Sequence, residues 1–127
     1  MNVILRQSLV FCVVFLLSGC YEQARDCERF VQGTFVSEVS IDNIVYKSKF
    51  KRYDNLQIET FKNMTDSATV RWINPCEYIL NTINPKSKSA EKPIHIKILT
   101  TSEDSYTFEY NFVGEFLKQT GTATKIE

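Results

Sequence analysis

Cysteine is the residue type in this chain whose positions point most directly to chemistry. The sequence has four cysteines, Cys12, Cys20, Cys27 and Cys76. Cys20 ends the segment Leu17-Ser18-Gly19-Cys20, in which a branched apolar residue and two small residues precede the thiol. This pattern looks like a bacterial lipobox, where the small residues fit a peptidase cleft and the sulfur receives a lipid. The segment predicts cleavage before Cys20 and lipidation of its thiol.

The residues before Cys20 have the composition of a secretory signal peptide. Arg6 precedes an unbroken apolar run of nine residues, 9–17. A membrane-spanning helix needs about 20 such residues, so the run is typical of a signal-peptide core. We expect residues 1–19 to be removed and residues 20–29 to form the lipidated cysteine and a tether. An uncleaved anchor and an ordinary secreted protein are the alternatives.

The lipid on Cys20 would decide where the protein works. Each buried methylene contributes about 0.8 kcal/mol, so two or three acyl chains, such as palmitate, would hold the protein on a membrane. Position 21 is a tyrosine, not the aspartate that retains many lipoproteins in the inner membrane. We therefore expect an outer-membrane lipoprotein, on the periplasmic face or at the cell surface.

Cys27 and Cys76 are the two thiols that remain in the exported protein. In an oxidising compartment a leftover pair predicts a disulfide. It would close a loop of about 50 residues, worth about 4 kcal/mol in the chain-entropy model. A redox or metal-binding pair is the alternative, but the chain has no Cys-x-x-Cys motif and a single histidine, His95.

Residues suited to catalysis or to holding a cofactor are sparse. His95 lies in an alternating segment on the side predicted to face solvent, beside Lys97. The aspartates and glutamates fall on predicted turns and outer faces without metal-ligand spacing, and the four glycines are isolated. We therefore expect no enzyme, no catalytic residue, no metal site and no cofactor. An envelope hydrolase or glycan-acting enzyme is the alternative from a different class.

The charge pattern gives no reason to expect a nucleic-acid partner. Fifteen basic residues balance fifteen acidic ones, so no net field attracts a polyanion. The basic segment 47–52 places Lys47, Lys49 and Lys51 on one face of a predicted strand. A charged outer face that blocks edge-to-edge pairing explains these lysines without any ligand.

The elements that must position these residues are strands. From Phe30 onward the apolar residues alternate with period two, and no helical period persists over three turns. The connections are short, which favours an antiparallel meander. We therefore predict one all-β domain over residues 30–127, a small up-and-down or lipocalin-like barrel, with a β-sandwich as the alternative. The eight expected strands are 33–39, 46–52, 56–61, 68–73, 77–82, 94–100, 106–112 and 118–126.

Two hairpins allow the register itself to be predicted. A three-residue turn at 102–104 pairs apolar with apolar residues, setting Ile98 opposite Phe108 and Thr100 opposite Tyr106. By the same test, a three-residue turn at 53–55 sets Phe50 opposite Ile58. These registers define which side chains face the core.

The inward-facing aromatic residues have two possible roles. They can fill the interior, because a barrel of eight short strands has little spare volume, or they can line a cavity for an apolar ligand. The ten-residue segment 84–93 is polar and is expected to be either a solvated connector or a mobile binding loop. The candidate cavity residues are Trp72, Tyr106, Phe108, Tyr110 and Phe112.

Five segments spread over most of the predicted domain form a pattern: Gly33-Thr34-Phe35, Gln57-Ile58-Glu59-Thr60, Thr69-Val70-Arg71-Trp72-Ile73-Asn74-Pro75-Cys76-Glu77-Tyr78-Ile79-Leu80, Lys97-Ile98-Leu99-Thr100 and Gly121-Thr122-Ala123-Thr124-Lys125-Ile126. This pattern resembles a family of small lipoproteins from Bacteroidetes and flavobacteria that has no established activity. Some members carry the label DNA topoisomerase IV, but an exported domain of 127 − 19 = 108 residues has no room for an ATPase and a DNA gate.

The expected architecture is also similar to that of periplasmic lysozyme-inhibitor lipoproteins, whose Ser-Gly-x-x-Tyr motif this chain lacks. A periplasmic inhibitor therefore stays a secondary alternative. The sequence as a whole predicts a lipid-anchored envelope protein that is a non-enzymatic binding or structural module. Its expected partners are the membrane, through the lipid on Cys20, and either a protein or a small apolar ligand.

Overall fold

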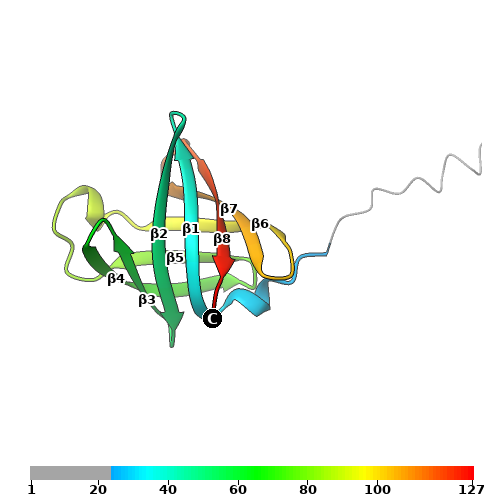
Figure 1. Cartoon of the computed structure of the whole chain (residues 1–127). Coiled ribbons are helices and arrows are strands. Elements are labelled where there is room, and N and C mark those ends of the chain that lie inside the picture. The colour runs from blue at the N-terminus through cyan, green and yellow to red at the C-terminus, as the bar shows by residue number, and fades with distance from the viewer. Residues whose placement is uncertain (1–23) are drawn as a thin grey trace, which may run out of the picture.

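The computed structural model describes residues 24–127, so the predicted signal peptide and Cys20 lie outside the described residues. The described chain is a closed barrel of eight antiparallel strands, in which each strand pairs with the next and the last pairs with the first (Figure 1). This confirms the predicted all-β meander barrel and not the β-sandwich. The strands are β1 (Gly33–Ile41), β2 (Ile44–Tyr53), β3 (Leu56–Phe61), β4 (Met64–Asn74), β5 (Glu77–Thr82), β6 (Ile94–Thr101), β7 (Ser105–Phe112) and β8 (Gln119–Lys125).

Three of the hairpins turn through two residues with positive φ, a geometry that matches the twist of the flanking strands. Asp54 and Asn55, with φ of 48° and 60°, form the β2–β3 turn. The predicted three-residue turn is therefore wrong, and Phe50 pairs with Glu59, not with Ile58. Asp and Asn tolerate this left-handed backbone well, which is why the shorter turn forms here.

The β6–β7 register is confirmed over most of its length. Ile98 pairs with Phe108, as the apolar pairing predicted. The pairing shifts between Ile98 and Thr100, so Thr101, not Thr100, lies opposite Tyr106. The irregularity adds one residue to β6, so the inward face is as predicted up to Ile98, and beyond it Thr101 takes the inward position predicted for Thr100.

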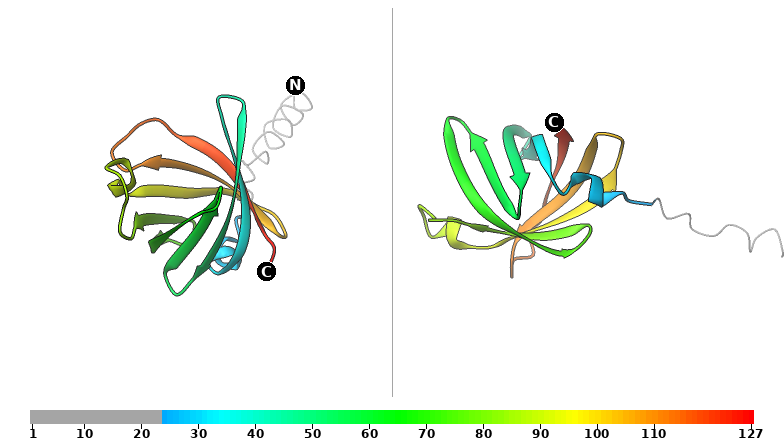
Figure 2. Two further views of the ribbon diagram at one scale, coloured as in Figure 1. Left: turned by 60° about the vertical axis from the view of Figure 1, so that its left-hand side comes forward. Right: turned by 90° about the horizontal axis from the view of Figure 1, so that it is seen from below.

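The two ends of the barrel differ in how they are covered. Two short 3₁₀-helices accompany the strands: η1 (Cys27–Phe30) and η2 (Ser89–Glu91). η1 and the C-terminus lie at one end, opposite the tip of the β1–β2 hairpin, and the strands curve around a common axis between the two ends (Figures 1 and 2). We call the η1 end the closed end. The other end, with the β1–β2 and β3–β4 turns and the β5–β6 and β7–β8 loops, is the open end.

A disulfide holds η1 in place at the closed end. Cys27 is bonded to Cys76 in the β4–β5 turn, with the two Cα atoms 5.3 Å apart, as the cysteine count predicted. Before the helix, the Arg25 guanidinium donates to the Ile98 carbonyl at 2.8 Å. The segment from Arg25 to Phe30 therefore packs on the barrel, although residues 20–29 were predicted to form a tether.

Arg52 is the polar centre of the closed end. Its side chain is only 1% exposed, and each of its five N–H groups has an acceptor, so the cation is fully hydrogen-bonded. The acceptors, at 2.6 to 3.3 Å, are the carbonyls of Phe30 and Val31, the Gln57 amide oxygen and the hydroxyls of Tyr78 and Tyr106.

Aromatic rings enclose the Arg52 guanidinium. The centroids of four rings lie 4.7 to 5.4 Å from its central carbon, close enough for cation–π attraction, and belong to Phe35, Phe50, Trp72 and Tyr78. Burial raises the pKa of the Tyr78 phenol above its ordinary value, so Tyr78 accepts the hydrogen bond as a neutral hydroxyl. These residues, which we call the Arg52 layer, fill the closed half of the barrel.

Replacing Arg52 should therefore destabilise the whole fold. Arg52→Leu leaves buried acceptors on η1, β3, β5 and β7 without a donor, and we expect a loss of about 3 to 5 kcal/mol in the free energy of unfolding. Lys51→Leu, on the exposed face of the same strand, should cost less than about 1 kcal/mol. Denaturant melts of both variants measure the contrast, and equal losses would contradict this role for Arg52.

Candidate functional site

The open half of the barrel is hollow. A cavity of about 320 Å³ extends from the Arg52 layer to the open end. This volume falls within the range of small-molecule sites in proteins. Its wall is predominantly aromatic and aliphatic, with Tyr46, Phe61, Leu80, Ile94, Ile96, Phe108 and Tyr110 among the lining residues.

Three of the five predicted cavity residues line this space, namely Tyr106, Phe108 and Tyr110. Trp72 belongs instead to the Arg52 layer, with its ring 4.6 Å from that of Tyr78. Phe112 lines a neighbouring side cavity of about 280 Å³. The inward aromatic residues thus have both predicted roles, because they pack the closed half and line the open half.

Glu59 is the polar residue of the cavity that sequence reasoning missed. The predicted register placed it on the outer face, opposite Lys49. The two-residue turn shifts β3 by one position, so Glu59 pairs with Phe50 and faces the interior. The signal in the sequence was the Asp54-Asn55 pair, whose tolerance of positive φ favours a two-residue turn.

The electrostatic environment of Glu59 is unusual for a carboxylate. Among residues 24–127, no ion pair or hydrogen bond joins the Glu59 side chain to another residue, and neither of its carboxylate oxygens is fully buried. Burial raises the pKa of the Glu59 carboxyl, and the charge of Asp66, its cross-strand neighbour, raises it further. The pKa of Tyr110 is also raised, by burial and then by the charge of Glu59. A carboxyl group and a phenol therefore lie near each other in a mainly apolar wall.

The β5–β6 loop covers one side of the cavity. Glu59, Leu80 and Ile94 line both the main cavity and the side cavity, so the two spaces adjoin. The loop, predicted as a solvated connector or a binding loop, supplies Ala90 and Lys92 to the side cavity. The loop therefore forms part of the wall of the side cavity.

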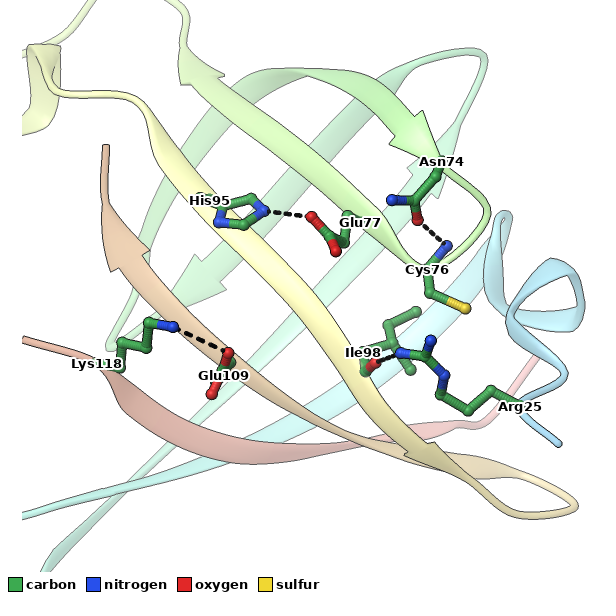
Figure 3. A network of polar contacts seen from close by, with 8 residues as sticks. All are labelled: Arg25, Asn74, Cys76, Glu77, His95, Ile98, Glu109 and Lys118. Carbon is green, nitrogen blue, oxygen red and sulfur yellow. Dashed lines mark hydrogen bonds and ion pairs between the residues drawn. The ribbon is translucent and has the colours of Figure 1, made fainter. Parts of the chain in front are cut away.

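His95 lies on the outer wall, away from the cavity. Its Nε2 lies 3.0 Å from the Glu77 carboxylate, and both side chains are partly buried (Figure 3). Burial alone would raise the pKa of Glu77, but hydrogen bonds with His95 and Asn74 lower it below its ordinary value. The outward orientation of His95 agrees with the predicted face, and Glu77 is the partner that sequence reasoning did not identify.

Two further searches concern only the residues that the structure describes. In this part of the chain, no group of three or more histidine, cysteine, aspartate or glutamate side chains is arranged to hold a metal ion. In the same part, no helix has the length and apolar character needed to cross a membrane.

The raised pKa of Glu59 predicts a pH-dependent stability. A carboxyl whose pKa is higher in the folded than in the unfolded chain binds more protons when folded, so stability falls as the pH rises through that interval. Glu59→Gln removes this effect. We expect the variant to be more stable than the parent at pH 7, with the difference shrinking below the ordinary glutamate pKa of about 4.3.

Denaturant melts over a pH series measure this difference. The matched control is Glu38→Gln on the exposed face of β1, where Glu38 pairs with Lys47 at 3.4 Å. The control should leave the pH profile of stability nearly unchanged. A Glu59→Gln variant less stable than the parent at pH 7 would show that the carboxylate has a partner that offsets its burial.

The chain has no match among family models, curated proteins or solved structures.

Proposed function

We propose that this protein is a lipid-anchored, non-enzymatic binding protein of the bacterial outer membrane, and that its barrel takes up a small, mainly apolar ligand. The observation that carries the proposal is the cavity of about 320 Å³ in the open half of the barrel. Burial of apolar surface contributes about 25 cal/mol per Å², so such a wall favours an apolar occupant. The cavity favours a small ligand over a protein partner or a purely structural role.

The place where the N-terminal segment joins the barrel supports an orientation in which the closed end faces the membrane. Residues 25–30 pack at the closed end, and the disulfide fixes η1 there. A lipid on Cys20, four residues before Ala24, would therefore attach near the closed end. In that arrangement the cavity opens on the side of the barrel away from the anchor, where a ligand has access.

Apolar side chains on the rim of the open end support uptake of an apolar ligand. Phe116 is 99% and Leu117 75% exposed in the loop between β7 and β8. Ile44 and Met64, next to the β1–β2 and β3–β4 turns, are also exposed. Exposed apolar residues that cluster in this way are typical of a surface that contacts a ligand or a membrane.

The lipobox pattern and the resemblance to small Bacteroidetes and flavobacterial lipoproteins belong to the same proposal. The disulfide fits an oxidising compartment outside the cytoplasm. Lipidation of Cys20 and uptake of a ligand are independent properties that can be tested separately.

Cys20→Ala should abolish lipid attachment, because the lipid bonds to the thiol of this residue. Metabolic labelling of the full chain with a palmitate analogue in a bacterial host measures the attachment. Cys12→Ala makes the same change inside the predicted signal peptide and should keep the label. Equal labelling of the Cys20→Ala variant and the parent would refute anchoring through Cys20.

Filling the cavity should abolish binding of an apolar probe. Ile94 lines both cavities near the open end, so Ile94→Trp places a larger ring in the space that a ligand would occupy. We expect the affinity for the neutral fluorophore N-phenylnaphthylamine to fall about tenfold or more, which corresponds to about 1.4 kcal/mol.

The control for this substitution is Lys97→Trp, which puts the same ring on the outer face of the same strand. Fluorescence titrations should give the parent affinity for this control. Melting curves of the two variants check that both are folded. Equal affinities of the folded Ile94→Trp and Lys97→Trp variants would show that the probe does not bind in the cavity.

A further inference from the structure

Glu59 faces the cavity without a cation from its own chain, because the nearby cations have other partners. Within residues 24–127, Lys92 pairs with Glu115 at 2.9 Å and Lys86 with Asp66 at 3.9 Å. Lys47, which also lines the cavity, pairs with Glu38 at 3.4 Å. Arg52, which bonds to Gln57 and Tyr78 of the cavity lining, uses its five donors in the Arg52 layer. A partly buried carboxylate without an ion-pair partner can accept a cation that enters from outside.

The wall around Glu59 suits a cation with an apolar body. The rings of Tyr46 and Phe61 lie 6.2 Å apart, and those of Phe108 and Tyr110 are also 6.2 Å apart. All four residues line the cavity. Aromatic faces attract ammonium groups, and this attraction strengthens where water is excluded.

The same charges disfavour an anionic ligand such as a fatty acid. Glu59 and its neighbour Asp66 both line the side cavity. The lysines that line the two spaces are paired with other carboxylates, Lys47 with Glu38 and Lys92 with Glu115. A carboxylate entering beside them would meet like charge in a poorly solvated space. The wall therefore discriminates between apolar ligands by the charge of their polar group.

We propose that the cavity selects an amphipathic amine, whose ammonium group pairs with the Glu59 carboxylate while its apolar body lies against Leu80, Ile96 and Phe108. This inference rests on the proposed binding function and specifies the ligand class. The ammonium replaces the missing counter-ion, and the body fills the hollow half of the barrel.

Three ligands with the same octyl chain separate the contributions of body and charge. Calorimetric titration of the purified full chain with octanol reports the apolar cavity alone. Octylammonium should bind about tenfold more tightly than octanol, because its charge pairs with Glu59, and this ratio corresponds to about 1.4 kcal/mol. Octanoate should bind more weakly than octanol.

Two variants locate the effect. Glu59→Gln should reduce octylammonium affinity to the level of octanol and leave octanol affinity unchanged. Glu109→Gln removes one negative charge from the outer face of β7, where Glu109 pairs with Lys118 at 3.3 Å, and should change neither affinity. Because the ligand series is also measured on the parent, the test does not depend on the folding of a variant.

Each other outcome overturns the inference. If octanol binds but octylammonium binds no more tightly, the cavity takes apolar ligands without regard to charge, and only the amine inference fails. Preferential binding of octanoate would likewise refute the amine class alone. If none of the three binds, both the amine inference and the proposed binding function fail. An octylammonium preference that survives Glu59→Gln would place the recognised charge elsewhere.

Discussion

The buried Arg52 guanidinium is the interaction on which the rest of the structure depends. It has no carboxylate partner among residues 24–127, and its charge is satisfied by neutral acceptors and aromatic faces. Two of those acceptors are the carbonyls of Phe30 and Val31, so the cation is fully bonded only while η1 stays at the end of the barrel. The disulfide at Cys27 keeps η1 there, which makes the cross-link and the buried cation mutually supporting.

The same constraint divides the interior into two halves with opposite properties. The Arg52 layer occupies the closed half, and the cavity of about 320 Å³ lies toward the open end. Gln57, whose amide oxygen accepts from Arg52, stands between the two halves. Glu59 follows two positions later on the same inward face of β3, so the interior has a satisfied positive group at its floor and an unpaired negative group higher in the wall. Because these two charged groups lie at different depths, an amphipathic ligand in the cavity would be oriented by the position of its polar group.

The fold could be predicted from the sequence where apolar side chains alternate with polar ones, because the buried face of a strand determines which of its side chains point into the core. Ile98 and Phe108 show this, since a one-residue slip would pair apolar with polar residues. Glu59 shows where the method fails. Its strand carries both polar and apolar residues on each face, so the turn decided the register, and the backbone preference of Asp54 and Asn55 outweighed the apolar pairing of Phe50 with Ile58. The buried position of Arg52 was equally hidden, because its acceptors come from distant segments.

The pairing of β8 with β1 determines when the barrel can form. Phe35 pairs with Lys125, and the Thr34 amide donates to the carbonyl of Glu127, so residues 119–127 close the wall against β1. Until β8 arrives, β1 and β7 are unpaired edges, which are prone to pair with other chains. Contacts between residues so distant in sequence form slowly. The barrel therefore cannot close until β8 is available to pair with β1, and a chain in which these residues are held back is exposed to aggregation through both edges.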